Sequence, residues 1–477
     1  MTISRVPTGI GGLDSLIEGG FPRGSLVLLA GNPGSGKTMF SARYLHHGLK
    51  LNEPGLYVSF AENRETFLAN MRRIGLDFEK YVSQKRFEFL DLFTVKEQGI
   101  EIILESIMGV ADASGAKRLV IDSFSALAQA FKDPIDVRVI VHTVLSRIVR
   151  KSDCTTIMIE EVPLGESKIG YGVEEFVADA VIVLKTGELD GRPLRDLEIV
   201  KIRGTELVEK KLVFTLKDCF RVFQPFRLKP VEKQVQFQPI PDPPGRFSTG
   251  TPDLDAMLGG GIPRGSTVLL EKDEKTSRAE YDFLMAPLAM NFAAQGRGVL
   301  ILPSVLFDYG AVREMVLSYG LSEKVFQSQI VLLDHQRLPH PEDVRPNVVQ
   351  LKGVDAMDDL LNVLESVTWL KSGRDQPALV SVSLDAGLSL YGEAQGRRLL
   401  DLTASTVRGR ASLFLLVGRE SPDNLTDKIS SIVDFHLKLT REHGSLLLYG
   451  VKPRTPLYAV ETDTSKGYPI PRLTPIV

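Results

Sequence analysis

The chain has 477 residues, 43% of them hydrophobic and 25% charged, which is typical of a globular protein with a well-formed core. The formal net charge of −3 gives no electrostatic reason to expect strong nucleic-acid binding, and the two cysteines, Cys154 and Cys219, exclude a disulfide framework. No cationic stretch followed by an apolar run opens the chain, and no long apolar run occurs, so we expect a cytoplasmic protein without a membrane span.

The chain begins with a segment that recurs 241 residues later. Thr8–Leu29 and Thr249–Leu270 align without a gap and share 13 identities in 22 positions. A period of this length is far too long for a solenoid repeat. The sequence therefore predicts two tandem domains of the same fold.

Short apolar runs alternate with stretches of helical apolar spacing through the first repeat. The predicted strands are 25–30, 55–60, 87–92, 118–123 and 155–160, and the predicted helices are 37–50, 64–75, 98–114 and 135–151. Such alternation indicates an α/β domain with a mainly parallel twisted sheet flanked by helices. After Asp179 three successive strand-like runs, VIVLK, LEIVKIR and KLVFTL, predict an antiparallel extension at the sheet edge.

The segment GNPGSGKT fits the pattern GxxxxGK[ST] between a predicted strand and a predicted helix. Its glycines let backbone amides gather close to phosphate oxygens, and the helix start adds its own amides and dipole. We expect Lys37 to reach the β- and γ-phosphates and Thr38 to ligate Mg²⁺. The alternative is a Gly/Pro-rich surface turn that matches by accident. The residues expected at the nucleotide are Gly31, Asn32, Pro33, Gly34, Ser35, Gly36, Lys37, Thr38 and Met39.

Two carboxylates follow predicted strands whose carboxyl ends converge on the same ligand. Asp122 ends an apolar run and is expected to hold the water shell of Mg²⁺, unless it only caps the next helix. Glu62 follows the strand 55–60 and is expected to orient the water that attacks the γ-phosphate. A glutamate at a helix start is also favoured by the helix dipole, and both interpretations can hold together.

These residues resemble the KaiC/RadA branch of the RecA-like ATPases, and KaiC-type proteins most closely. The resemblance extends to TGIGGLDSLIEGGFPRG near the start, to IGYGVEEFVADAVIVLK (169–185) and to LEIVKIRGTELVEKKLVFTL (197–216), in the expected order. It covers the first 220 residues and, more faintly, the second half. The resemblance implies two tandem RecA-like domains, ATP as the nucleotide, and a homo-oligomer, often a hexameric ring with ATP held between subunits.

The resemblance also gives Lys201 and Arg203, in KIRGT, a role across the subunit interface. Family members send basic side chains from this position to the γ-phosphate of a neighbour, where a guanidinium stabilises developing charge. The alternative is a pair of surface residues on an edge strand that make ordinary ion pairs. One departure concerns Ala61–Glu62, since KaiC domains usually carry two adjacent glutamates there; the single glutamate could slow hydrolysis or alter its control.

The second repeat lacks the three chemical features of the first. Its phosphate-loop position, Glu271–Ala279, contains no glycine, and the position of Asp122 aligns with Val382. The position of Glu62 gives Ser304 or Val305, and Lys452 and Arg454 repeat the basic pair as relics. Ser430 and Ser431 lie where the circadian KaiC second domain is phosphorylated, but we expect an ordinary helix end there.

These patterns divide the chain into an active domain (1–221), a proline-rich linker (222–246) and a degenerate domain without a nucleotide site (247–477). The simplest function is a slowly ATP-hydrolysing regulatory ATPase, in which the second domain serves assembly or binds a protein partner that the sequence does not name. A non-hydrolysing ATP-bound scaffold or transcriptional regulator, akin to the KaiC-related gas-vesicle regulators, is the alternative. DNA is disfavoured, because the segment 160–176 has five glutamates and one lysine.

Overall fold

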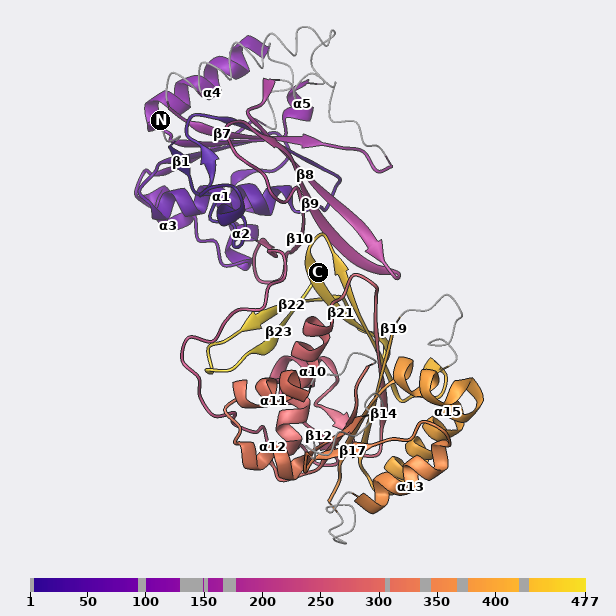
Figure 1. The fold of residues 1–477 in the computed structure, drawn as a ribbon. Coiled ribbons are helices and arrows are strands. Elements are labelled where there is room, and N and C mark those ends of the chain that lie inside the picture. The colour runs from indigo at the N-terminus through magenta and orange to yellow at the C-terminus, as the bar shows by residue number, and fades with distance from the viewer. Residues whose placement is uncertain are drawn as a thin grey trace. The chain divides into compact units, whose positions relative to one another are not determined.

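The computed structural model describes residues 4–92, 100–128, 149, 153–165, 177–304, 309–334, 345–366, 376–419 and 429–477. They form two compact units (Figure 1). The first unit comprises Met1–Pro225, His443–Ser445 and Pro475–Val477, and the second comprises Phe226–Glu442 and Leu446–Thr474. Within the described part of the chain, no helix is long and apolar enough to cross a bilayer.

The first unit is built on a nine-stranded sheet with the order β11-β10-β9-β8-β3-β7-β6-β4-β5. Its strands are β3 (Leu26–Gly31), β4 (Gly55–Ser59), β5 (Phe87–Asp91), β6 (Arg118–Asp122), β7 (Thr155–Glu161), β8 (Ala180–Leu189), β9 (Arg192–Ile202), β10 (Lys211–Thr215) and β11 (Arg221–Val222). The strands from β8 to β5 are parallel, whereas β9, β10 and β11 pair antiparallel. The predicted parallel sheet with an antiparallel edge extension is confirmed.

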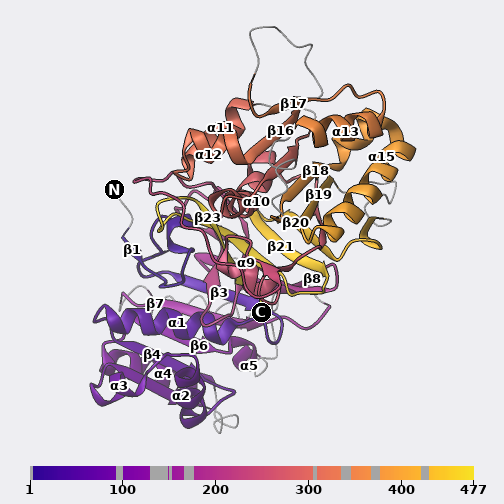
Figure 2. The ribbon, with the colours of Figure 1, turned by 90° about the horizontal axis from the view of Figure 1, so that it is seen from below.

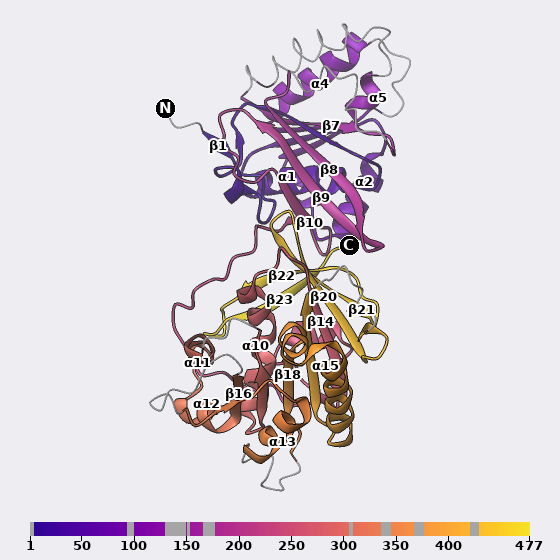
Figure 3. The same cartoon turned by 45° about the vertical axis from the view of Figure 1, so that its right-hand side comes forward.

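Helices cover both faces of this sheet (Figures 1 and 3). They are α1 (Lys37–Lys50), α2 (Arg64–Arg73) and α3 (Glu79–Ser83) on one face, and α4 (Ile100–Ser114) and α5 (Phe124–Ala128) on the other. In α1 the buried Phe40, Tyr44 and Leu45 recur at helical spacing and pack against the sheet. The predicted helix at 135–151 lies outside the described residues, apart from Val149.

A short segment before β3 explains why the repeat keeps a threonine and an aspartate six positions apart. The backbone and hydroxyl of Thr8 both donate to Asp14, which opens the one-turn helix η1 (Asp14–Leu16), at 2.8 and 2.6 Å. Thr249 donates in the same way to Asp255 at 2.7 Å. The segment then enters the sheet through the hairpin of β1 (Arg5–Val6) with β2 (Phe21–Pro22), and β12 (Arg246–Phe247) pairs with β13 (Ile262–Pro263) in the second unit.

The second unit contains a ten-stranded sheet with the order β17-β16-β15-β18-β19-β14-β20-β21-β22-β23. Its strands are β14 (Thr267–Lys272), β15 (Val299–Leu302), β16 (Ile330–Asp334), β17 (Val348–Gln350), β18 (Leu379–Ser383), β19 (Leu413–Arg419), β20 (Phe435–Glu442), β21 (Ser445–Lys452), β22 (Tyr458–Asp463) and β23 (Ile470–Pro475). The run β20-β14-β19-β18-β15-β16 repeats the order β8-β3-β7-β6-β4-β5 of the first unit. Both units therefore have the predicted RecA-like α/β architecture.

The helices of the second unit also lie on two faces of its sheet (Figure 2). They are α10 (Arg278–Ala294), α11 (Tyr309–Ser318) and α12 (Glu323–Gln329) on one face, and α13 (Ala356–Ser366) and α15 (Leu384–Gly409) on the other; the short α9 (Pro252–Met257) precedes the sheet. The segment 222–246 crosses the division between the units. Phe226 and Phe237 within it are buried in the core of the second unit, where Phe237 contacts Tyr319.

Candidate nucleotide site

The phosphate loop lies between the end of β3 at Gly31 and the start of α1 at Lys37. Gly36 caps the helix with φ of 97°, a conformation that a side chain disfavours. A Cβ on Gly31 would lie 2.5 Å from the Leu184 carbonyl oxygen and 2.7 Å from the Ser35 hydroxyl oxygen. The glycines at these positions are thus required by the fold of the loop, which supports the interpretation as a phosphate loop rather than a surface turn.

Lys37 points back over the loop. Its ammonium group donates to the carbonyl oxygens of Gly31 and Asn32 at 2.8 and 2.9 Å. Burial lowers the pKa of Lys37, although the charges of Glu161 and Asp122 oppose this shift. The buried Ser35 hydroxyl has no hydrogen-bond partner among the described residues. A loop that offers a cation and an unsatisfied hydroxyl fits a phosphate group.

Thr38 and Asp122 are brought together at the carboxyl ends of two strands. The Thr38 hydroxyl donates to Asp122 Oδ2 at 3.2 Å, and the Tyr57 hydroxyl donates to the same oxygen at 2.5 Å. Burial raises the pKa of Asp122, and the hydrogen bonds from Tyr57 and Thr38 and the charge of Lys37 reduce that shift. A hydroxyl beside a carboxylate is a donor set that Mg²⁺ accepts, so the residues present fit this ion.

The raised pKa of Asp122 leads to a stability prediction. Since the folded state holds the proton of Asp122 more tightly than the unfolded chain does, its ionisation costs stability as the pH rises from the usual value of 3.8 through the raised one. We expect Asp122→Asn without nucleotide to melt at a higher temperature than the wild type, and the difference to grow with pH in this window. Melting curves from pH 4 to pH 7 measure it; a variant that is less stable throughout would show that the carboxylate is needed for folding.

Glu62 does not line the cavity beside the loop, but it contacts Asn70, which does. The cavity has a volume of about 600 Å³ and is lined by Pro33, Gly34, Gly36, Lys37, Thr38, Met39, Asn70, Met71, Arg73, Ile74, Asp122 and Glu161. The Glu62 carboxylate accepts a hydrogen bond at 2.7 Å from Asn70, which does line it. Asn63 caps α2, so Glu62 directly precedes the helix. This position is compatible with both interpretations of Glu62.

The sequence analysis missed two residues near the loop, Glu161 and Arg195. Glu161 ends β7 in register with Gly31, and its charge acts on Lys37. It follows a predicted strand directly, so the rule that strand ends converge on the ligand would have found it. Arg195 on β9 donates to the Gly34 carbonyl oxygen at 3.1 Å, a contact that no local pattern indicates.

Lys201 and Arg203 are placed away from the loop. Lys201 pairs with Val181 at the start of β8, which runs parallel to β3, so it lies at the amino end of these strands and the loop lies at the other. Arg203 makes an ion pair of 3.2 Å with Asp179, which also accepts from the backbone of Leu26. Both residues therefore lie too far along the strands to contact the loop of the same chain.

Comparison with known proteins adds the family. A family model described as KaiC, an ATPase, matches residues 6–223, which contain the whole loop and Asp122. A UPF0273 protein of Pyrococcus horikoshii is 34% identical over 232 residues, which are 45% of this chain and 91% of that protein. Residues 6–223 form a domain of the KaiC family of ATPases, and the chain is KaiC-like.

Other relatives of this KaiC-like chain match over different lengths. The circadian clock oscillator protein KaiC of Prochlorococcus marinus strain SARG is 31% identical over 280 residues, 56% of this chain and 54% of that protein. The chain thus spans about half the length of the curated clock proteins that it matches. A crystal structure of a KaiC-like protein of Pyrococcus horikoshii covers 47% of this chain and is itself covered fully, with 36% identity and a TM-score of 0.42.

A second family model, described as GvpD basic region 2, matches residues 236–335. In this KaiC-like chain the matched region has eight lysines and arginines and twelve aspartates and glutamates. The region is therefore acidic here, which gives no electrostatic argument for nucleic-acid binding.

The loop of the second unit differs in geometry from that of the first. Asp273, at the position of Asn32, accepts from the hydroxyls of Thr276 and Thr440 at 2.6 Å and from the backbone of Arg441 at 3.0 Å. The loop thus closes around a carboxylate of its own. The sheet register places Ser383, and not Val382 as aligned from the sequence, at the position of Asp122.

Ser430 takes part in a buried polar chain. Its hydroxyl lies 2.7 Å from His436 Nδ1, and His436 Nε2 lies 2.7 Å from Glu271, which also pairs with Lys438 at 3.3 Å. These contacts connect the segment before β20 to β14. They give Ser430 a structural role, in agreement with the expected helix end.

Proposed function

We propose that the first unit binds ATP with Mg²⁺ and hydrolyses it slowly in a homo-oligomer, a hexameric ring being the form that the family resemblance implies. The observation that supports this most is the Thr38–Asp122 contact of 3.2 Å beside Lys37 in a loop that requires its glycines. The membership of residues 6–223 in the KaiC ATPase family supports the same activity.

The position of each residue suggests its role in ATP binding or hydrolysis. The loop amides and Lys37 would hold the phosphates, and Thr38 and Asp122 would hold Mg²⁺, which when bound neutralises phosphate charge. Glu62, steadied by Asn70, would orient the attacking water. Lys201 and Arg203 of a neighbouring copy would reach the γ-phosphate, because within one chain they lie at the end of the strands opposite the loop.

Steady-state phosphate release with ATP and Mg²⁺, together with the mass of the protein in the same buffer, tests this function. We expect turnover above that of Lys37→Ala and a mass of several chains. A monomer that hydrolyses ATP would contradict the assembly, and wild type without turnover above Lys37→Ala would contradict the activity.

Glu62→Gln separates hydrolysis from binding. The amide keeps a hydrogen bond to Asn70 but no longer accepts a proton, so we expect hydrolysis to fall about 10²- to 10⁴-fold with ATP affinity unchanged. Single-turnover hydrolysis and a binding titration measure the two quantities. Glu65→Gln, on the first turn of α2, is the matched control and should leave both unchanged. If Glu62→Gln hydrolyses at the wild-type rate, Glu62 only starts the helix.

We further propose that the second unit has no nucleotide site and serves assembly or binds a protein partner. The absence of glycine from Glu271–Ala279 and the self-closing contacts of Asp273 support this. We expect ATP to bind with a stoichiometry of one per chain, and Lys37→Ala to weaken this binding. Two sites per chain would contradict it.

The second candidate function is a non-hydrolysing ATP-bound scaffold or regulator. The match to the GvpD model over residues 236–335 and the single glutamate beside Ala61 favour it. It predicts ATP binding and ATP-dependent assembly without turnover above Lys37→Ala. DNA-linked activity stays the least favoured, and salt-sensitive DNA binding would be its signature.

A further inference from the structure

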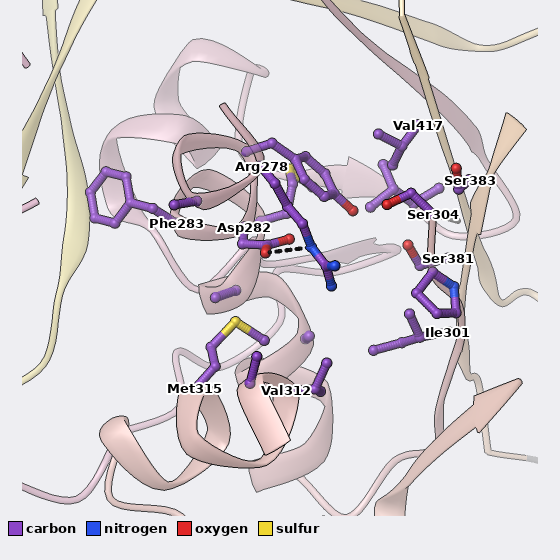
Figure 4. Close-up of a pocket in the computed structure, with 18 of the residues that line it drawn as sticks. Arg278, Asp282, Phe283, Ile301, Ser304, Val312, Met315, Ser381, Ser383 and Val417 are labelled. Atoms are coloured by element: carbon purple, nitrogen blue, oxygen red, sulfur yellow. Dashed lines mark hydrogen bonds and ion pairs between the residues drawn. The ribbon is translucent and has the colours of Figure 1, made fainter. Parts of the chain in front are cut away.

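The second unit encloses a cavity of about 310 Å³ that the proposed function does not use (Figure 4). It lies between α10 and α11 on one side and the strands β15, β18 and β19 on the other. Its volume is at the lower end of the range of small-molecule pockets. All the residues that line it belong to the second unit, so it is a feature of that unit alone.

The mouth of the cavity uses positions that form the phosphate site in the first unit. The repeat offset of 241 and the sheet register place Lys272 at the position of Gly31 and Arg419 at that of Glu161. Arg278, the first residue of α10, stands at the position of Lys37. A side chain at Gly31 would collide with the loop of the first unit, whereas here Lys272 lines an open space. The second unit therefore has a cavity at the position equivalent to the phosphate loop, but with cationic side chains in place of Gly31 and Glu161.

Among the described residues at the mouth of the cavity, three cations, Lys272, Arg278 and Arg419, face two carboxylates, Asp282 and Asp385. Arg278 pairs with Asp282 at 3.3 Å, and Arg419 pairs with Asp385 at 3.5 Å. In Figure 4 the first pair faces Ser304, Ser381 and Ser383 across the cavity. Lys272 has no ion pair with any described residue, and its ammonium lies 5.9 Å from the centre of the Tyr281 ring. Burial and the charge of Arg419 lower the pKa of Lys272, while the charges of Asp282 and Asp385 oppose this shift. A half-buried cation without a carboxylate partner attracts one anionic group.

The interior beyond the mouth is apolar, with one polar atom left unsatisfied. Its walls come from α10, α11 and the sheet, namely Phe283, Met285, Ala286, Ala289, Ile301, Val312, Met315, Leu379 and Leu415. The Tyr319 side chain, which also lines the cavity, is 1% exposed, and its hydroxyl has no hydrogen-bond partner among the described residues. The apolar part of a ligand would fill the space between these walls, as in small-molecule sites with few polar groups.

From Lys272, which has no ion pair with a described residue, and from the apolar interior of the cavity, we infer that the second unit binds one amphipathic carboxylic acid with an aliphatic tail. The carboxylate lies at Lys272 near Arg278 and Arg419, and the tail lies between α10 and the sheet. This inference goes beyond the proposed function and does not depend on ATP hydrolysis by the first unit.

Calorimetric titration of the full chain with three ligands of equal chain length tests the inference. Decanoate should bind once per chain, and decanol should bind about tenfold or more weakly, because its hydroxyl carries no negative charge to attract the ammonium group. Decylammonium should show no binding. Equal affinity for decanoate and decanol, or no saturable binding, would overturn the proposal.

Variants locate the site. Lys272→Met should remove the preference for decanoate over decanol, whereas Lys275→Met, whose side chain is 65% exposed and pairs with Glu442, should keep it. Ala289→Leu narrows the cavity from α10 and should weaken both ligands. Circular dichroism and ATP binding by the first unit show that each variant is folded. If none of the variants changes decanoate binding, this site is refuted. It is also refuted if ATP displaces decanoate from the Lys37→Ala variant.

Discussion

Lys37→Ala is expected to lower ATP hydrolysis about 10²-fold or more and to weaken ATP binding. The Lys37 ammonium lies within the loop, 2.8 Å from the Gly31 carbonyl oxygen, and compensates the carboxylates of Asp122 and Glu161. Without it these two carboxylates repel the phosphates, so binding and transition-state stabilisation are lost together. Titration with a fluorescent ATP analogue and phosphate release measure the two effects.

Lys275→Ala is the matched control for Lys37→Ala. Lys275 precedes a threonine as Lys37 does, but it lies in the glycine-free loop of the second unit and is paired with Glu442 at 3.6 Å. We expect it to leave ATP affinity and hydrolysis unchanged. A comparable loss in Lys275→Ala would mean that the second unit takes part in nucleotide binding, contrary to the proposed division of roles.

Arg203→Ala is expected to reduce hydrolysis by about 10³-fold while ATP binding and folding persist. The side chain is 55% exposed and its ion pair with Asp179 is a surface pair, so its loss costs about 1 kcal/mol of stability or less. The effect on hydrolysis is large only if the guanidinium reaches the γ-phosphate of a neighbouring subunit. Lys210→Ala, an exposed lysine of the same unit, is the control and should keep full activity.

Mixing two inactive variants distinguishes a role across the interface from a structural one. In an oligomer assembled from Lys37→Ala and Arg203→Ala chains, some interfaces combine an intact loop with an intact Arg203. Part of the hydrolysis should return, and the recovered rate should peak near equal amounts. Mixed oligomers that form, as shown by mass, but stay inactive would indicate that Arg203 acts within its own chain, for example through its contact with Asp179.

The sequence alone determined the features that depend on residues close together in the chain. Gly31–Thr38 predicts its own loop because glycines, a preceding strand and a following helix are local signals. The structure has α1 at the predicted 37–50 and β3 one residue later than the predicted 25–30. The 241-residue repeat predicted that both halves share one fold, which the common strand order confirms. The change from helix-separated strands to successive strands after Asp179 likewise predicted the antiparallel edge.

Only the tertiary structure decided which distant side chains meet. Sheet register set Glu161 beside Gly31 and assigned Ser383 to the position of Asp122. It also placed Lys201 at the end of the strands opposite the loop. The cavity of the second unit needed the same long-range packing, because Lys272 and Tyr319 line it from segments that no local pattern connects. A motif specifies the chemistry available on one turn of chain, whereas strand pairing and helix packing specify its neighbours. In this KaiC-like chain, the motif indicated the loop where phosphate is expected to bind. The packing showed that the equivalent position of the second unit borders an apolar cavity with Lys272 at its mouth.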